Sequence, residues 1–148
     1  MALIVTHACP LRFPSRDVWR AAGAYGALHH IHSGTESCTL EDGGRLRVLV
    51  TNSGAILWER LLAFDEEGMT LRYQIIDTKA MENCPYGRGY VGEVRIAQEG
   101  AHNSVFHYQG TFDPLPGYDE EQSRASVKAF AQDCADGIAR YLHNRSAA

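Results

Sequence analysis

A long amphipathic helix placed after a series of alternating segments most constrains how this chain can fold. Between residues 120 and 144, apolar residues recur at steps of three and four, so a helix there has one apolar face. That face must be buried, and the only large surface the chain offers for it is a sheet. The residues that define the face are Val127, Phe130, Ala131, Cys134, Ile138, Tyr141 and Leu142.

The sheet is predicted from a period of two that begins near Ser33. Polar turns that contain glycine, such as Glu41-Asp42-Gly43-Gly44 and Asn52-Ser53-Gly54, separate successive segments. Short strands joined by such turns pair as an antiparallel meander. The expected strands lie near residues 34–41, 45–52, 56–65, 70–77, 86–98 and 103–113.

Before the meander, residues 2–12 predict a further strand, and residues 17–24 and 25–31 predict two short helices. We therefore expect an α+β helix-grip fold. In it a seven-stranded curved antiparallel sheet surrounds the long C-terminal helix, with two short helices between strands 1 and 2. The length of 148 residues, without a repeat or a linker, predicts one domain over residues 1–148.

Charge and composition disfavour two classes of partner. The net charge of −4 provides no positive field for nucleic acid or for an anionic membrane surface. Residues 1–12 do not resemble an export signal, so we expect a cytoplasmic protein. In a reducing compartment the cysteines, which form no CxxC pair, are expected to be free thiols: Cys9, Cys38, Cys84 and Cys134.

Four stretches in this order resemble the START/Bet v1-like (SRPBCC) superfamily, and within it bacterial proteins similar to polyketide cyclases and dehydrases. They are Asp17-Val18-Trp19, Tyr25-Gly26-Ala27-Leu28, Trp58-Glu59-Arg60-Leu61-Leu62-Ala63-Phe64-Asp65 and Thr111-Phe112-Asp113-Pro114. Plant abscisic-acid receptors share the same stretches. The resemblance implies a cavity for a hydrophobic ligand between the sheet and the long helix. It does not decide catalysis, because the superfamily includes enzymes, receptors and transporters.

Glu59 and His32 are the first candidates for the cavity. Strand alternation places Glu59 on the inner face with Leu57, Leu61 and Ala63, where a carboxylate needs a partner or a proton. In the plant receptors the similar glutamate binds ligand through water, and a ligand-anchoring lysine matches His32. The two residues could form a pair that transfers a proton. A structural glutamate and a solvated histidine are the alternatives.

Aromatic residues complete the predicted site. Tyr73, Tyr90 and Tyr108 fall on the inward phase of three strands, where their hydroxyls would suit an oxygenated ligand, unless they only fill the core. Residues 87–92 predict a glycine-containing bend in a long strand, from which Arg88 could reach the opening. The full predicted ligand-binding set is Tyr25, His32, Leu57, Glu59, Leu61, Tyr73, Ile75, Arg88, Tyr90, Tyr108, Phe130 and Cys134.

Three functions follow as hypotheses. The first is binding of a small hydrophobic molecule that is polyketide-, terpenoid- or aromatic-like. The second is a cyclase, aromatase or dehydratase in which His32 and Glu59 are the catalytic residues. The third is a regulatory or interaction module, with a homodimer as one form, that uses the outward residues Trp58, Arg60 and Leu62. We expect no cofactor and no metal, because no nearby Asp or Cys completes a set with the histidines at 29, 30 and 32.

Overall fold

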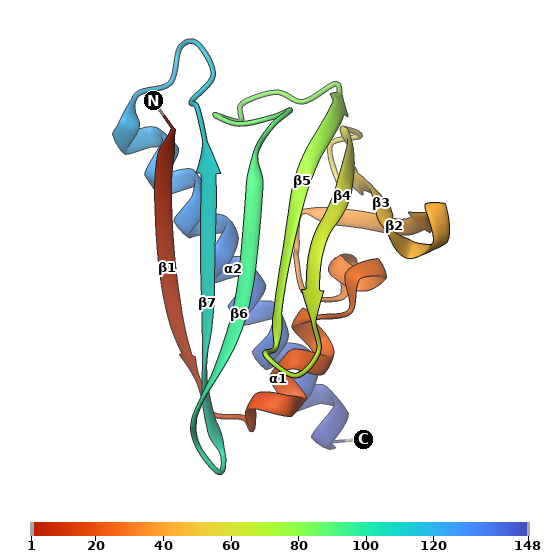
Figure 1. Cartoon of the computed structure of the whole chain (residues 1–148), viewed down its shortest axis with the longest axis vertical. Coiled ribbons are helices and arrows are strands. Elements are labelled where there is room, and N and C mark those ends of the chain that lie inside the picture. The colour runs from red at the N-terminus through yellow and green to blue at the C-terminus, as the bar shows by residue number, and fades with distance from the viewer. Residues whose placement is uncertain (1, 148) are drawn as a thin grey trace.

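The computed structural model describes residues 2–147, which form two layers: a seven-stranded antiparallel sheet and a long helix behind it (Figure 1). The spatial order of strands is β1-β7-β6-β5-β4-β3-β2, so all pairs except β1 with β7 are neighbours along the chain. This arrangement confirms the predicted helix-grip fold. Its elements are β1 (Leu3–Leu11), α1 (Ser15–Ala22), η1 (Tyr25–His30), β2 (Thr35–Glu41), η2 (Asp42–Gly44), β3 (Leu46–Thr51), β4 (Ile56–Asp65), β5 (Thr70–Lys79), β6 (Val91–Gly100), β7 (Asn103–Phe112) and α2 (Glu120–Ala147).

The predicted strand over residues 86–98 is wrong at its beginning. β6 begins only at Val91, and residues 87–90 form a turn in which the Tyr90 N–H donates to the Gly87 carbonyl at 3.0 Å. Gly89 has a φ of +97°, which reverses the chain at a position where a side chain would be strained. These glycines therefore make a turn, and they do not bend a long strand.

The predicted inward face of β4 is also wrong at one end. The pairing of β4 with β5 shifts between Leu61 and Ala63, as it does between Trp58 and Glu59. An extra residue on one strand changes which side chains face the core beyond it. Ala63, expected inside, is therefore exposed.

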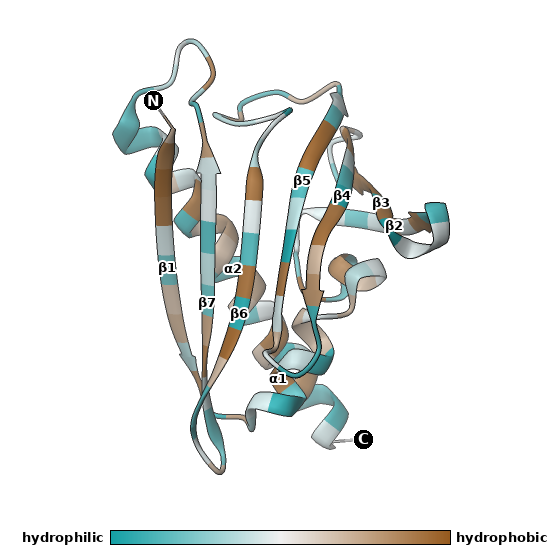
Figure 2. Ribbon diagram, in the orientation of Figure 1, coloured by the Kyte–Doolittle hydropathy of each residue, from teal (hydrophilic) through white to brown (hydrophobic). Residues whose placement is uncertain are grey.

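Side-chain periodicity positions the two layers. Bands of hydrophobic and hydrophilic residues alternate along β5 and β6, so that one face of the sheet meets the helix (Figure 2). From α2 the residues Val127, Ala131 and Ile138 are fully buried against that face. No helix within residues 2–147 is both long enough and apolar enough to cross a membrane.

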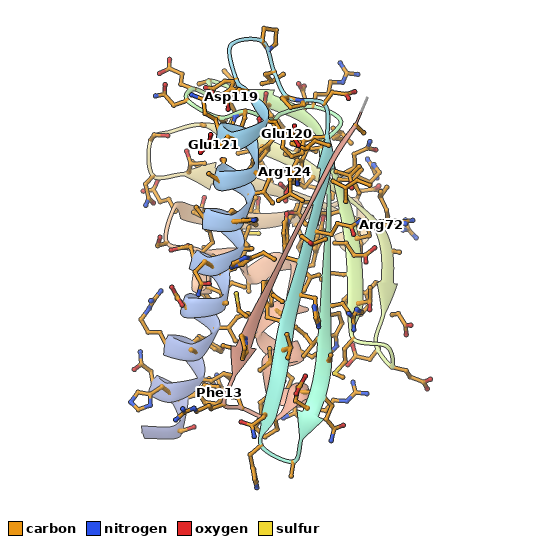
Figure 3. The ribbon with its side chains drawn as sticks, turned by 90° about the vertical axis from the view of Figure 1, so that its left-hand side faces the viewer. Phe13, Arg72, Asp119, Glu120, Glu121 and Arg124 are labelled. Carbon is orange, nitrogen blue, oxygen red and sulfur yellow. The ribbon has the colours of Figure 1, made fainter. Side chains whose placement is uncertain are left out.

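The N-terminus of α2 is held by reciprocal hydrogen bonds. The Gln122 N–H donates to the Asp119 carboxylate at 2.7 Å, and the Asp119 N–H donates to the Gln122 side chain at 2.9 Å. One turn later, Arg124 donates to the Ile4 carbonyl of β1 at 3.1 Å and to Glu120 at 2.9 Å (Figure 3). These contacts fix the first half of α2 beside the edge strand β1.

The second half of α2 is fixed by a close backbone contact. A Cβ atom built on Gly137 would overlap the carbonyl group of Ile31, which follows η1. Only glycine lets the helix approach that carbonyl so closely. With α2 attached to β1 near its start and to η1 near its end, the middle of the helix lies over the inner face of the sheet.

We expect Gly137→Ala to destabilise the protein by about 1–3 kcal/mol, because the added methyl group must displace backbone atoms. The loss would outweigh the ~1 kcal/mol by which alanine favours a helix over glycine. Urea unfolding measures the change. Gly100→Ala is the matched control, since no atom lies within 4 Å of the added Cβ. Unchanged stability of Gly137→Ala would contradict the close approach.

Candidate functional site

A cavity of about 110 Å³ lies between the inner face of the sheet and α2. Its wall is mainly apolar. A few polar side chains reach it from the segment after η1, from the strands β2 to β5 and from the loop before β6. The lining residues are Leu28, His32, Thr35, Leu49, Thr51, Leu57, Glu59, Tyr73, Ile75, Met81, Tyr86, Tyr90 and Phe130. A smaller cavity of about 20 Å³ shares Leu28, Tyr73 and Phe130 with the first and adds Arg47, Tyr108 and Cys134 to its wall.

Most of the predicted ligand-binding residues meet at these cavities. Those that line the larger cavity are His32, Leu57, Glu59, Tyr73, Ile75, Tyr90 and Phe130, and those that line only the smaller one are Tyr108 and Cys134. The structure places Tyr25, Leu61 and Arg88 outside both. Arg88 is exposed in the turn before β6, and Leu61 is half-buried where β4 shifts its register.

Glu59 has a partner that the sequence reasoning missed. The Arg47 Nε donates to the Glu59 Oε1 at 2.7 Å, and both side chains are only 5% exposed. Among residues 2–147 no hydrogen bond joins Glu59 to His32, so the expected His32–Glu59 pair is not formed. The signal for Arg47 was available: counting outward from the turn Asn52-Ser53-Gly54 places Arg47 opposite Glu59, as the register confirms.

Arg47 also lies between two aromatic rings. Its guanidinium is 4.2 Å from the ring centre of Tyr25 and 4.7 Å from that of Tyr73. It donates to the Tyr25 carbonyl at 3.3 Å, and the Tyr25 hydroxyl donates to the Glu59 carbonyl at 2.8 Å. Burial, the largest single influence, would lower the pKa of Arg47, but the charge of Glu59 and its hydrogen bond, together with Tyr73 and Tyr25, raise that pKa overall. The cation is therefore charged, and it is paired with Glu59 inside the protein.

His32 lies where η1 leads into β2. Its Nδ1 is 2.8 Å from the Thr35 hydroxyl, and its Nε2 is 3.6 Å from the Asp133 carboxylate on α2. Asp133 is held in turn by the N–H and hydroxyl of Ser33 at 2.8 and 2.7 Å. Burial lowers the pKa of His32, although Asp133 opposes the shift, so the imidazole is neutral at pH 7.

Three tyrosine hydroxyls converge between the cavities. The Tyr108 hydroxyl is 2.7 Å from that of Tyr73 and 2.7 Å from that of Tyr90. Burial raises the pKa of all three well above its ordinary value, so they are neutral. Gly92 and Gly110 make room for this cluster, since a Cβ on either would collide with Tyr73 or Tyr90. The Tyr73 ring thus lies against Gly92, and the Tyr90 ring lies against Gly110.

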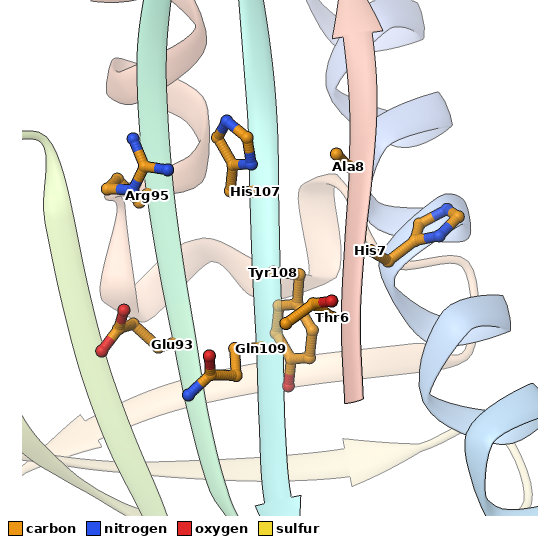
Figure 4. A pocket seen from close by; sticks show the side chains of 8 residues that line it. All are labelled: Thr6, His7, Ala8, Glu93, Arg95, His107, Tyr108 and Gln109. Carbon is orange, nitrogen blue, oxygen red and sulfur yellow. The ribbon is translucent and has the colours of Figure 1, made fainter. Parts of the chain in front are cut away.

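A groove of about 250 Å³ lies on the opposite, outer face of β1, β7 and β6 (Figure 4). Glu93, Arg95, His107 and Gln109 project into it, and opposite charges lie side by side. Because it is a shallow polar surface, we place the candidate site at the inner cavity. Within residues 2–147, no group of three or more His, Cys, Asp or Glu side chains is arranged to hold a metal ion.

A scan against protein families matches residues 3–143 to the family described as polyketide cyclase/dehydrase and lipid transport. The chain belongs to this family. The match covers nearly the whole chain and agrees with the family resemblance noted in the sequence. A search of curated proteins finds no match.

Solved structures of similar fold include other members of the helix-grip class. XoxI from Bacillus cereus has a TM-score of 0.84 at 20% identity, over 96% of this chain and 97% of that one. An uncharacterised protein from Bacillus thuringiensis has a TM-score of 0.76 at 22% identity, covering 96% and 98%. Norcoclaurine synthase from Thalictrum flavum, in complex with dopamine and hydroxybenzaldehyde, has a TM-score of 0.74 at 15% identity, covering 97% and 88%. At these identities the likeness concerns the fold.

Removing one charge of the buried pair should be costly. We expect Glu59→Gln to lose about 3–5 kcal/mol of unfolding free energy, because Arg47 is left uncompensated, and the double variant Arg47→Met/Glu59→Leu to recover most of it. Chemical denaturation measures both. The exposed pair of Arg60 and Asp42, 3.0 Å apart, is the control, and Arg60→Met should lose less than about 1 kcal/mol. Equal losses of unfolding free energy in Glu59→Gln and Arg60→Met would contradict this interpretation.

The lowered pKa of His32 predicts a dependence of stability on pH. Below its ordinary pKa of 6.5 the unfolded chain binds a proton at this histidine more readily than the folded chain does. Stability should therefore fall as the pH decreases below about 6.5, until the folded histidine is also protonated. His32→Gln should reduce this acid-induced loss. His102→Gln, at the exposed turn after β6, should leave it unchanged, and identical pH profiles for all three proteins would count against the assignment.

Proposed function

We propose that this protein encloses a small, mainly apolar molecule about one ring in size, in the cavity beneath α2. The observation that carries the proposal is an internal cavity with an apolar wall, at which several polar side chains converge. This combination is typical of small-molecule sites, in which apolar contacts supply affinity and a few polar groups fix orientation.

The cavity volume restricts the ligand. Sites for drug-sized molecules measure about 300–1,000 Å³, whereas an apolar cavity of about 150 Å³ holds benzene. A cavity of about 110 Å³ therefore favours a single ring over an extended polyketide or terpenoid. Norcoclaurine synthase, which has a similar fold, is described in complex with dopamine and hydroxybenzaldehyde, and each of these has one ring. That complex supports a one-ring ligand for a fold of this kind.

Met81 and Tyr86, from the loop before β6, form part of the cavity wall. Methionine is flexible and fills irregular spaces, so this part of the wall can adapt to a ligand somewhat larger than the cavity. The opposite wall, formed by Leu57, Glu59 and Ile75 on paired strands, is rigid by comparison. Ligand size is thus limited by the sheet and adjusted by the loop.

Catalysis is the second candidate, and the neutral state of His32 favours it. A neutral imidazole at a cavity wall can accept a proton from a bound molecule. Glu59 is committed to Arg47 at 2.7 Å, so the proton would pass between His32 and the ligand directly. Loss of turnover in His32→Gln, with ligand affinity retained, would support a cyclase- or dehydratase-type reaction.

Filling the cavity tests the binding proposal. Toluene should raise the melting temperature of the wild-type protein in a concentration-dependent way, because a ligand of the folded state stabilises it. We expect Ile75→Phe, which adds a ring at the cavity wall, to abolish this shift. Ile76→Phe, at the next residue of β5, which lines neither cavity, should preserve it. Differential scanning calorimetry measures the shift in melting temperature. If toluene causes no shift in the wild-type protein, a ring-sized site is excluded.

A further inference from the structure

The hydroxyls of Tyr73, Tyr90 and Tyr108 form a cluster that carries three hydrogens, and only two of these have an acceptor within the cluster. Three hydroxyls make two oxygen–oxygen contacts, Tyr73 with Tyr108 and Tyr90 with Tyr108, each at 2.7 Å. Each contact uses one hydrogen, so one of the three has no acceptor in the cluster. Within residues 2–147 these hydroxyls make no other hydrogen bond. Their raised pKa values keep all three hydrogens in place.

In every arrangement of the cluster, the tyrosine that carries the spare hydrogen lines a cavity. If Tyr108 donates to one neighbour and accepts from the other, the spare hydrogen belongs to Tyr73 or Tyr90, which both line the larger cavity. If both neighbours donate to Tyr108, it belongs to Tyr108 at the smaller one. A head-to-tail chain is favoured because successive hydrogen bonds polarise one another, so the last donor in it is strengthened.

A buried donor without an acceptor is costly, and a ligand that supplies the acceptor recovers that cost. We propose that the molecule enclosed here is a ring-sized carbonyl compound whose oxygen accepts the spare tyrosine hydrogen. This inference rests on the proposed binding function and adds the chemical class of the ligand. The ring would lie against the apolar wall, among Leu49, Leu57, Ile75 and Phe130.

The charges in the site favour a neutral acceptor over an anion. Arg47, whose guanidinium lies 4.7 Å from the ring centre of Tyr73, is already paired with Glu59 at 2.7 Å. A carboxylate ligand would add an uncompensated negative charge to a cavity that Glu59 also lines. A carbonyl oxygen accepts the hydrogen bond and adds no charge.

Benzaldehyde and styrene test this inference, because they have similar shapes and only benzaldehyde has a carbonyl oxygen. We expect the wild-type protein to bind benzaldehyde about three- to tenfold more tightly than styrene, as one added hydrogen bond predicts. The triple variant Tyr73→Phe/Tyr90→Phe/Tyr108→Phe, which removes all three hydroxyls, should lose this preference and still bind styrene. Tyr118→Phe, which removes a hydroxyl outside both cavities, should retain it. Isothermal titration calorimetry gives the affinities.

The carbonyl stretching frequency of bound benzaldehyde reports the hydrogen bond directly. In the wild-type protein it should lie below the frequency in hexane, and in the triple variant it should return toward that value. If the triple variant does not fold, the wild-type frequency and the wild-type ratio of the two affinities still test the inference.

Equal affinities for the two compounds, with a hexane-like frequency, would overturn the carbonyl inference and leave the binding proposal intact. Binding of neither compound would overturn both.

Discussion

A guanidinium buried between two tyrosine rings organises the inner face of this protein. Arg47 of β3 contacts Glu59 of β4, Tyr73 of β5 and Tyr25 of η1. A buried charge is tolerated only when it is paired and hydrogen-bonded, so these groups must meet with little freedom. This constraint connects three strands and the short helix.

The same pairing determines which groups are available for chemistry. Because Glu59 neutralises Arg47, it is not the partner of His32, and the neutral imidazole faces the cavity with Thr35 beside it. The tyrosine cluster adds a donor close to the apolar wall. The cavity therefore combines apolar surface, one neutral base and one spare hydrogen-bond donor. The scaffold of the polyketide cyclase/dehydrase and lipid transport family supplies the enclosure, and the inward side chains decide what it can hold.

The sequence predicted the fold better than the details of the site. Alternation with polar turns located the six strands of the meander, and the apolar face of the last segment located α2, because both patterns reflect burial on one side of a regular element. The beginning of β6 was missed, because Gly87 and Gly89 were interpreted as a bend when they form a turn closed by backbone hydrogen bonds. Arg47 was missed because an arginine in a strand is usually exposed, although its register with Glu59 could have been counted from the turn.

By itself, the sequence determined the order of the elements, the inward phase of Glu59, Tyr73 and Tyr108, and membership of a cavity-forming fold. These depend on periodicity along the chain, which local sequence carries. Only the tertiary structure decided which buried polar groups pair: Glu59 with Arg47, His32 with Thr35 and Asp133, and the tyrosines with one another. It also set the cavity volume. Pairing and volume depend on distances between strands and helices far apart in the chain, fixed by register shifts and by close approaches such as that of Gly137 to Ile31.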